Sequence, residues 1–259
     1  MADERWRQLL GQQTVGGRRL LYLAEAESTN TLALSRAEAG LLIIADTQTG
    51  GRGRWSRNWH SPAGEGLYCS LTTRPQAMDP GELPRLTLAA GLAVAEAVEA
   101  LTGVLTGIKW PNDIQIDGRK VAGILMETSL TGRNALLVTG IGVNVTTTAF
   151  PAAIADKAGS LLSTTGRHID RGLLLEEILR TIDRWFAAAA AGDYAGVLAA
   201  WRRRDVCRDR RLHWLSSDGA VIAGVACGID EQGCLLIRDD QGRLHSVLSG
   251  DVQPVAAQK

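Results

Sequence analysis

The sequence lacks most of the features that set a chain apart from an ordinary globular protein. It has four cysteines in 259 residues, and no two of them form a CxxC pair. Lysine plus arginine and aspartate plus glutamate number 28 each, so the formal net charge is zero. The longest apolar runs fall far short of the roughly 20 residues that a membrane-spanning helix needs. We therefore expect no disulfide framework, no membrane span and no general basic surface for nucleic acid.

The N-terminus gives no sign of export. Its first ten residues, MADERWRQLL, include acidic side chains and no long apolar stretch, so no signal peptide is apparent. The four cysteines are then expected to be reduced structural thiols, and the protein is expected to be cytoplasmic. A chain of this length buries roughly 70–75% of its unfolded surface, so its core needs neither a metal nor a disulfide.

Hydrophobic periodicity predicts alternating strands and helices up to about residue 200. Strands are predicted at residues 41–45, 67–73, 114–116, 121–126 and 135–145. Asp117-Gly118 accepts the positive φ angles of a tight turn and therefore predicts a hairpin between two of these strands. Helices are predicted at residues 31–39, 83–101, 172–191 and 194–201. Asp170 and Asp193 stand where the last two helices need N-caps.

The composition changes after the basic run at residues 202–204. Four short strands are predicted beyond it, at residues 211–215, 220–229, 234–238 and 243–248, with turns at Asp218-Gly219, Gln232-Gly233 and Gln241-Gly242. About fifty residues of such strands indicate a small barrel rather than another α/β unit. The sequence thus predicts two domains, residues 1–204 and 205–259, and it predicts that the basic run is a solvated helix end.

The segment most suggestive of chemistry lies between two predicted strands, at residues 48–62 (QTGGRGRWSRNWHSP). It contains no acidic residue, and its glycines, arginines and tryptophans are Gly50, Gly51, Gly53, Arg52, Arg54, Arg57, Trp55 and Trp59. Glycines let backbone N–H groups approach an anion, arginines add charge-assisted donors, and an indole face can stack on a base. This composition suits a nucleotide, but it also suits a solvated surface loop. The sequence contains neither a GxxxxGKS/T phosphate loop nor the three glycines of a dinucleotide fingerprint.

Four further polar segments stand at predicted strand or helix ends: Ser28-Thr29-Asn30, Lys109-Trp110-Pro111-Asn112-Asp113, Lys120, and Gly140-Ile141-Gly142-Val143-Asn144. Each has a structural alternative. One residue of the first segment can cap the helix that follows, and Asn112-Asp113 can be turn chemistry. The cation of Lys120 can meet an anionic ligand or pair with Asp113 or Glu127. The small residues of the last segment offer a floor for a planar ring.

Taken in order, these segments resemble the catalytic domain of biotin protein ligases. The resemblance rests on Ser28-Thr29-Asn30, the GRGR core of residues 48–62, KWPND at 109–113, KVAGIL at 120–125 and GIGVN at 140–144. Residues 228–233 resemble the family's SH3-like barrel. The resemblance implies an α+β (mixed α/β) fold. A catalytic domain with a mixed sheet packed by helices would bind biotin and ATP at residues 1–204, and a small SH3-like β-barrel would follow at 205–259.

The resemblance also implies the activity. Such an enzyme activates biotin with ATP to biotinyl-5′-AMP, releases pyrophosphate, and transfers biotin to one lysine of the biotin carboxyl carrier domain of a biotin-dependent carboxylase, such as acetyl-CoA carboxylase. Mg²⁺ is expected to accompany ATP. No metal ligands are assigned, and Glu127 is only a weak candidate. The loop is expected to order over the adenylate and to exclude water from it.

The family's site residues carry over position by position. Biotin would be bound by Ser28, Thr29, Asn30, Gln48, Arg52, Gly53, Arg54 and Lys120; the nucleotide by Arg52, Arg54, Trp59 and Asn144; and the catalytic residues would be Arg54, Lys120, Asp113 and Lys109. The cations would offset the repulsion between two anions, the biotin carboxylate and the α-phosphate. The loop reads GRGRWSRNW where well-known members read GRGRRGRKW, so its charge differs from theirs.

The sequence also allows other functions. Lipoate ligation or octanoyl transfer uses a similar scaffold, and a nucleic-acid-binding module could use the Arg/Trp loop and the barrel as contact surfaces. Fewer than thirty residues precede Ser28, which is too short for the winged-helix domain of repressor relatives, so a monofunctional enzyme that does not bind DNA is expected. Partners beyond the acceptor domain are open, a homodimer among them.

Overall fold

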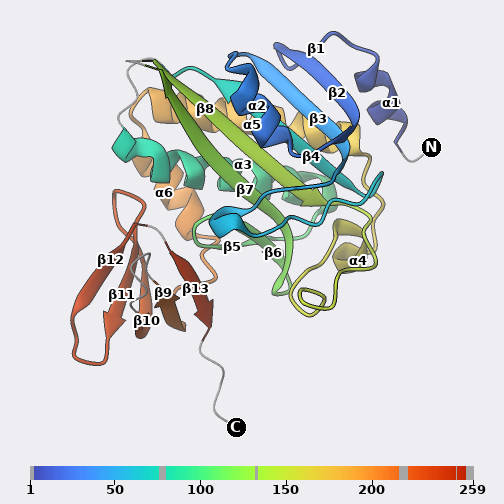
Figure 1. Cartoon of the computed structure of the whole chain (residues 1–259). Helices are drawn as coiled ribbons and strands as arrows, with labels where there is room; N and C mark the ends of the chain where they lie inside the picture. Colours follow the sequence, from blue (N-terminus) through green and yellow to red (C-terminus); the bar gives the residue numbers. More distant parts are fainter. Residues whose placement is uncertain (1–2, 76–79, 132–133, 216–220, 249, 255–259) are drawn as a thin grey trace.

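The structure is a computed structural model of the chain, and it describes residues 3–75, 80–131, 134–215, 221–248 and 250–254. Two sheets organise these residues (Figure 1). The larger sheet has eight strands in the order β1-β2-β3-β4-β8-β7-β6-β5. Their bounds are β1 (Thr14–Val15), β2 (Arg18–Ala26), β3 (Leu41–Gln48), β4 (Gly66–Thr73), β5 (Gly107–Lys109), β6 (Asp113–Ile116), β7 (Arg119–Thr131) and β8 (Asn134–Asn144). Strands β2 and β3 pair in parallel and the others antiparallel, so the sheet is mixed, as expected.

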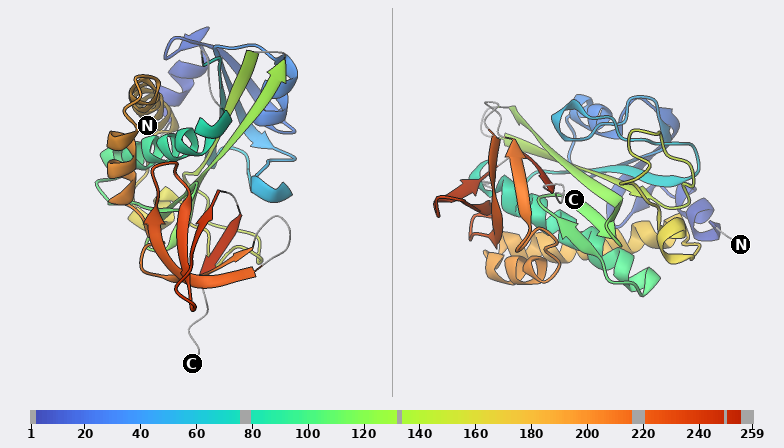
Figure 2. Two further views of the ribbon diagram at one scale, coloured as in Figure 1. Left: turned by 90° about the vertical axis from the view of Figure 1, so that its left-hand side faces the viewer. Right: turned by 90° about the horizontal axis from the view of Figure 1, so that it is seen from below.

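Helices cover both faces of this sheet. Their bounds are α1 (Glu4–Leu10), α2 (Thr29–Arg36), α3 (Leu83–Thr102), α4 (Leu161–Thr165), α5 (Arg171–Ala190) and α6 (Tyr194–Arg202), with 3₁₀ turns at Arg54–Ser56 and Pro80–Glu82. Helix α2 packs on β3, β4 and β8, while α3 packs with α5 and α6 on the opposite face. Figure 2 shows α3, α5 and α6 as one layer beside the sheet. The predicted α+β class is confirmed.

Helices on both sides of the sheet bury both faces of β4. Its sequence alternates in the way of a strand with one solvated face, yet Tyr68, Ser70 and Thr72 are as buried as Leu67 and Leu71. The polar face lies under α2, and its hydroxyl groups are satisfied there by hydrogen bonds. Leu41 N, for example, donates to Thr72 Oγ1 at 2.8 Å. The polar face of β4 can therefore contribute hydroxyl groups to a buried polar site.

Residues 3–26 form a helix and two strands that the sequence did not predict. Helix α1 is short, but a carboxylate far away in the sequence supports its first turn. Asp170 accepts from the backbone N–H groups of Arg5 at 2.9 Å and Trp6 at 3.2 Å, and it also caps α5 through Gly172 N at 2.7 Å. One carboxylate thus serves two helix N-termini. Strand β2 was not predicted either, because its residues show no clean alternation.

The C-terminal sheet is antiparallel and has five strands in the order β12-β11-β10-β9-β13. Their bounds are β9 (Arg211–Leu215), β10 (Val221–Ile229), β11 (Leu235–Asp239), β12 (Leu244–Val247) and β13 (Asp251–Pro254). The four predicted strands are present, and β13 adds a fifth beside β9. The predicted turn at Asp218-Gly219 lies outside the described residues.

Residues 203–210, between α6 and β9, form the linker to this sheet, and its backbone is hydrogen-bonded to β5. Ile108 N donates to Arg204 O at 2.6 Å, and Val206 N donates to Ile108 O at 3.2 Å, so the linker runs alongside the strand. The indole of Trp110 then donates to Gly233 O at 3.0 Å in the second sheet. These contacts place the C-terminal sheet beside the KWPND segment.

The basic run before the linker is not simply solvated, so that expectation is wrong for Arg204. Its guanidinium donates to both carboxylate oxygens of Glu99, at 2.6 and 2.9 Å. Burial acts to raise the pKa of Glu99, but hydrogen bonds from Arg204 and Thr106 outweigh it and lower that pKa. Arg204 therefore anchors the segment after α6 to α3. Among the described residues, no helix has both the length and the apolarity to cross a bilayer.

Candidate active site

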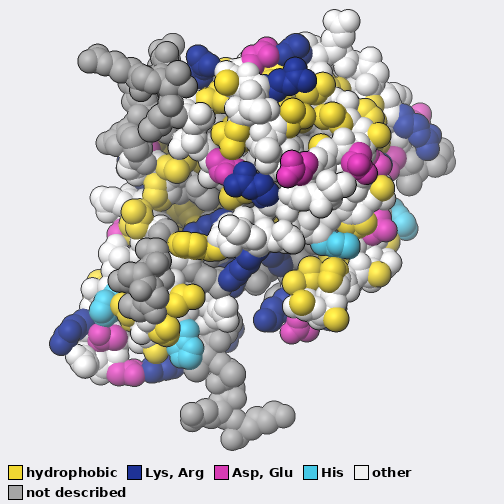
Figure 3. Space-filling view, viewed as in Figure 1, with side chains coloured by type: hydrophobic (Ala, Val, Ile, Leu, Met, Phe, Trp, Pro, Cys, Tyr) yellow, Lys and Arg dark blue, Asp and Glu magenta, His cyan; other side chains and the backbone are white. Residues whose placement is uncertain are grey.

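A cavity of about 770 Å³ opens where the sheet, the 50–59 segment and the linker meet. We call residues 50–59 the arginine loop. The cavity is lined by seven cationic and two acidic side chains: Arg52, Arg54, Arg57, Lys109, Lys120, Lys157, Arg210, Asp113 and Asp117. In the space-filling view, Lys and Arg side chains gather at a hollow above the C-terminal sheet (Figure 3). A chain with no net charge thus concentrates positive charge at one site, which favours an anionic ligand.

One end of the cavity is lined by three uncharged hydrogen-bonding residues, Thr29, Asn30 and Gln48, and Ser61 and Ser70 hydrogen-bond to these side chains. We call these five residues the amide cluster. Gln48 Oε1 accepts from Thr29 N at 2.9 Å, and Gln48 Nε2 donates to Ser61 Oγ at 3.0 Å. These bonds fix which atom of the Gln48 amide faces which neighbour. The cluster can therefore present donors and acceptors to a small polar ligand in a defined arrangement.

Asn30 is the most constrained member of the cluster. Its Oδ1 accepts from Ser70 Oγ at 2.6 Å, and its Nδ2 donates to Leu125 O at 3.2 Å and to Glu127 Oε2 at 2.9 Å. The amide lies over Gly140, where an added Cβ would come within 2.2 Å of Asn30 Oδ1. A glycine on β8 thus makes room for the amide of α2.

A second glycine on β8 receives an aromatic ring. The indole of Trp59 lies on Gly142, where an added Cβ would come within 2.5 Å of the indole Cε2, and it also approaches Gly123 on β7. The predicted floor for a planar ring is therefore present, but the ring that covers it is the protein's own Trp59. The ammonium of Lys120 stands 5.2 Å from the centroid of this ring.

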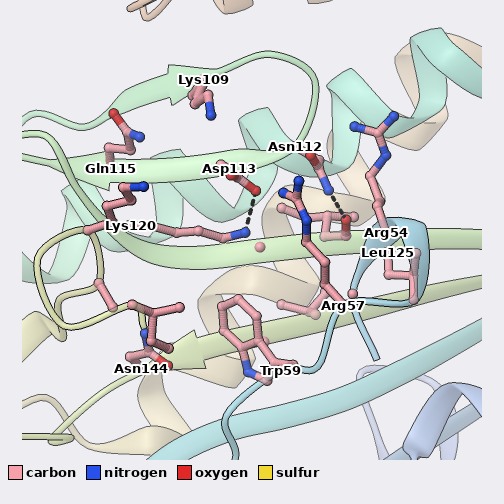
Figure 4. A pocket seen from close by; sticks show the side chains of 18 of the residues that line it. Arg54, Arg57, Trp59, Lys109, Asn112, Asp113, Gln115, Lys120, Leu125 and Asn144 are labelled. Atoms are coloured by element: carbon pink, nitrogen blue, oxygen red, sulfur yellow. Dashed lines mark hydrogen bonds and ion pairs between the residues drawn. The ribbon is translucent and has the colours of Figure 1, made fainter. Parts of the chain in front are cut away.

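The other end of the cavity carries most of the charge (Figure 4). Lys120 Nζ lies 2.5 Å from Asp113 Oδ1, so of the two carboxylates considered from the sequence, Lys120 pairs with Asp113. The second candidate, Glu127, pairs with Arg52 at 2.9 Å. Lys109 points toward the same space from β5, and Arg54 and Arg57 extend toward it from the arginine loop. Charges from three separated segments of the sequence therefore line one cavity.

The arginine loop is held in a narrow hairpin by its own backbone. Gly53 N donates to Arg57 O at 2.7 Å, and Trp59 N donates to Gly51 O at 2.8 Å. At the tip, Trp55 and Ser56 have φ angles of 58° and 56°. They are two of the three positions at which the loop departs from the family pattern; the third is Asn58. Non-glycine residues adopt this region rarely, because the Cβ meets the backbone.

Ser28 and Asn144, both expected to bind ligand, also make hydrogen bonds that stabilise the local fold. Ser28 is the residue of its segment that caps α2, where its side chain accepts from Thr31 N. Asn144 Nδ2 donates to Gly159 O at 2.9 Å, so its amide fastens the end of β8 to the segment before α4. Both remain candidates for ligand contact, and Asn144 lines the cavity.

The sequence pointed to some of these side chains and missed others. Ser70 and Ser61 were not singled out, and Glu127 was noted only as a weak metal candidate. Lys157 and Arg210 line the cavity itself and were not predicted. Nothing local distinguishes these residues, because each acquires its place through a segment distant in sequence. A serine within an otherwise apolar strand, such as Ser70, was the one signal available.

Two cysteines line the cavity as neutral thiols. Burial raises the pKa of Cys69 to about 12 and that of Cys207 to about 11. The thiolate, which is the nucleophilic form, is therefore disfavoured at both positions near neutral pH. The four cysteines are free thiols in the structure, as expected.

The fold and site define an enzyme of the biotin/lipoate protein ligase class. The sequence model of the biotin/lipoate A/B protein ligase family matches residues 22–144, and that of the biotin protein ligase C-terminal domain matches residues 215–253. The chain belongs to the biotin protein ligase family. The C-terminal match favours this family over the lipoate alternative considered from the sequence.

Curated relatives and solved structures agree with this assignment. The biotin–acetyl-CoA-carboxylase ligase of Mycobacterium tuberculosis is 35% identical over 259 residues, which cover 95% of this chain and 92% of that protein. The bifunctional ligase/repressor BirA of Bacillus spizizenii is 35% identical over 246 residues, covering 92% and 75%. The biotin protein ligase of Aquifex aeolicus, solved with biotin and ATP, superimposes with a TM-score of 0.80 at 30% identity, covering 91% and 99%.

Proposed function

We propose that this protein activates biotin with ATP and transfers it to a lysine of the biotin carboxyl carrier domain of a biotin-dependent carboxylase. The observation that carries the proposal is the composition of the cavity, where an uncharged amide cluster lies at one end and convergent cations lie at the other. The uncharged end suits a neutral ring with donors and acceptors, as the ureido ring of biotin has. The cationic end suits a carboxylate beside a triphosphate.

In the first step, a carboxylate oxygen of biotin attacks the α-phosphorus of ATP. The new O–P bond forms as the bond to pyrophosphate breaks, which gives biotinyl-5′-AMP. Arg52, Arg54, Lys109 and Lys120 are proposed to offset the repulsion between the reacting anions and to stabilise charge on the phosphoryl oxygens. Mg²⁺ is expected to enter on the phosphates of ATP, since it binds commonly through substrate phosphates with few protein ligands. The described residues contain no group of three or more His, Cys, Asp or Glu arranged to hold a metal.

In the second step, the amine of the acceptor lysine attacks the acyl carbon of the adenylate. The amide bond forms, the bond between carbon and the AMP oxygen breaks, and the nitrogen loses a proton. Asp113 is proposed to orient this amine or to accept its proton. The carboxylate of Asp113 is held in place by its 2.5 Å contact with Lys120. Because Lys120 is proposed to bind the carboxyl end of biotin, this contact keeps Asp113 near the acyl carbon that the amine attacks.

The other proposed roles follow the resemblance. Biotin is proposed to contact Ser28, Thr29, Asn30, Gln48, Arg52, Gly53, Arg54 and Lys120, and the nucleotide to contact Arg52, Arg54, Trp59 and Asn144. All twelve proposed site residues, the catalytic Lys109 and Asp113 included, line the cavity. This common location is the support for the set.

The experiment is exchange of labelled pyrophosphate into ATP, with biotin present or absent. We expect exchange that depends on biotin and that neither lipoate nor octanoate supports. Addition of a purified biotin carboxyl carrier domain should then give a biotinylated product detectable with streptavidin. Absence of exchange, or equal exchange with lipoate, would overturn the proposal.

The domain and partner assignments complete the proposal. We propose a boundary near residue 205, supported by the irregular linker between α6 and β9. We propose a monofunctional enzyme that binds no DNA, and gel-shift assays on promoter DNA test this. Whether the protein forms a homodimer is left open, and light scattering measures it. A cytoplasmic location is likewise a proposal, and cell fractionation tests it.

A further inference from the structure

Glu127 joins two parts of the site that lie far apart in the sequence. Its Oε2 accepts from Asn30 Nδ2 at 2.9 Å, and its Oε1 accepts from Arg52 Nη2 at 2.9 Å. Asn30 belongs to the amide cluster, and Arg52 belongs to the arginine loop. One carboxylate therefore connects the end of the cavity that takes a neutral ligand to the loop that would cover it.

Glu127 lies just outside the lining of the cavity. It stands on β7 two positions beyond Leu125 on the same face, and Leu125 lines the cavity while Glu127 does not. Its side chain is 22% exposed, whereas that of Arg52 is 45% exposed. The acid is thus the fixed member of the pair, and the arginine is the member that can move.

The Asn30 end of this connection is rigid. Asn30 is 4% exposed, is held by Ser70 and Leu125 O, and lies against Gly140, which leaves its amide one orientation. The orientation directs the NH₂ group toward Glu127 and the oxygen toward Ser70. With Asn30 fixed, the second oxygen of Glu127 is directed outward to Arg52. The carboxylate geometry therefore specifies where the guanidinium is held.

Resting on the proposed function, we propose that Glu127 is a positioning residue that holds Arg52 over the biotin end of the cavity before ligand arrives. A guanidinium placed in advance lowers the ordering cost that binding would otherwise carry. Without Glu127, Arg52 would share the freedom of a 45% exposed arginine on a surface loop. Glu127 does not line the cavity, so its loss should affect binding more than the chemical step.

The test is the variant Glu127→Gln, with Glu177→Gln as a matched control. Glu177 is 21% exposed and pairs with Arg180 on α5, away from the cavity. In biotin-dependent pyrophosphate exchange, E127Q should raise KM for biotin about 5- to 10-fold and change kcat less than about twofold, the effect of a charge-assisted hydrogen bond at a partly exposed pair. E177Q should match the wild type. A loss confined to kcat, or a changed Mg²⁺ requirement at unchanged KM for biotin, would overturn the proposal.

A double-mutant cycle separates positioning from a general structural effect. In an Arg52→Ala background, E127Q should add less than about twofold to KM, because the residue that it positions is already gone. Equal effects of E127Q in both backgrounds would contradict the proposal. Glu127→Asp keeps the charge on a shorter stem and should fall between wild type and E127Q, so the test survives if E127Q folds poorly.

Limited proteolysis supplies a readout that needs no activity. Trypsin can cut after Arg52, Arg54 or Arg57, and the rate of cutting reports how often the loop opens. Without ligand, E127Q should be cut in this loop at least about threefold faster than wild type or E177Q. Unchanged cutting would overturn the positioning role even if the enzyme were active. A wild-type protein without exchange, but with faster cutting of E127Q, would overturn the proposed function alone.

Discussion

Trp59 packs against Gly142 so closely that a methyl group on this glycine would stand 2.5 Å from the indole Cε2. Gly142→Ala should therefore displace the ring from the sheet and into the cavity. Because Trp59 ends the arginine loop, we expect pyrophosphate exchange to fall at least about tenfold, while overpacking at one methyl lowers the unfolding free energy by about 1–3 kcal/mol.

The matched control for this variant is Gly11→Ala, where the nearest atom to the added Cβ is 3.6 Å away. Gly11 caps α1 with a φ of −82°, which alanine accepts. G11A should keep both activity and stability. Full exchange activity in G142A, with a melting temperature equal to wild type, would show that the ring position is immaterial.

Ser70 supports the amide cluster from behind. It is fully buried, and its Oγ lies 2.6 Å from Asn30 Oδ1 and 2.7 Å from Thr29 Oγ1. Ser70→Ala leaves a buried amide oxygen without this donor, so we expect a loss of about 1–3 kcal/mol in unfolding free energy and a higher KM for biotin. Urea unfolding and exchange kinetics measure the two effects. Ser35→Ala, at an exposed position of α2, is the control, and equal behaviour of the two variants would refute the prediction.

The elements that the sequence predicted well carry local signals. The strand at residues 41–45 is continuously apolar, and the Asp117-Gly118 turn has φ angles of 49° and 74°, which its two residues tolerate better than most. Asp170 and Asp193 cap α5 and α6, as predicted, because an N-cap acts on residues two or three positions away. Periodicity and capping depend on residues close together in the chain, so they can be predicted from a single sequence.

The relationships that complete the site are long-range. Ser70 meets Asn30 across 40 positions, and Arg52 meets Glu127 across 75. Composition drew attention to the arginine loop, but it gave no indication of the acid that holds Arg52. Nor could it show that Trp59 would occupy the glycine floor. These pairings depend on the order of strands in the sheet, which no local pattern specifies.

Asp113 offers a way to separate the two half-reactions. Its carboxylate contacts Lys120 at the charged end of the cavity, and we propose that it handles the acceptor amine. Asp113→Asn should slow transfer from preformed biotinyl-5′-AMP to the acceptor domain about 10²-fold, a typical contribution of a positioned acid or base. Adenylate formation should fall less, because Lys120 retains its charge. Single-turnover assays of each step test this prediction. Equal slowing of both steps would show that Asp113 acts only by positioning Lys120 and not on the acceptor amine.

The buried thiol of Cys69 makes the protein sensitive to high pH. Burial raises its folded-state pKa from 9.0 to about 12, so the unfolded chain loses this proton first as the pH rises. The stabilisation is complete below pH 9 and is lost between about pH 9 and 12, at up to about 1.4 kcal/mol per pH unit. Cys69→Ala should therefore have a shallower decline in unfolding free energy between pH 9 and 10.5 than wild type. Parallel declines would show that this thiol does not contribute.

Arg54 is the residue of the arginine loop whose removal should affect the first step most. It begins the 3₁₀ turn at Arg54–Ser56 and extends toward the cavity beside Arg57 (Figure 4). Removing one preorganised donor to developing charge typically lowers a rate by about 10²–10³-fold, and we expect Arg54→Ala to lower biotin-dependent pyrophosphate exchange by about this factor. The control is Arg36→Ala, at the exposed end of α2, which removes the same charge far from the loop tip and should leave exchange unchanged. Wild-type exchange in R54A would remove Arg54 from the catalytic set and leave the remaining cations of the cavity to offset the charge of ATP.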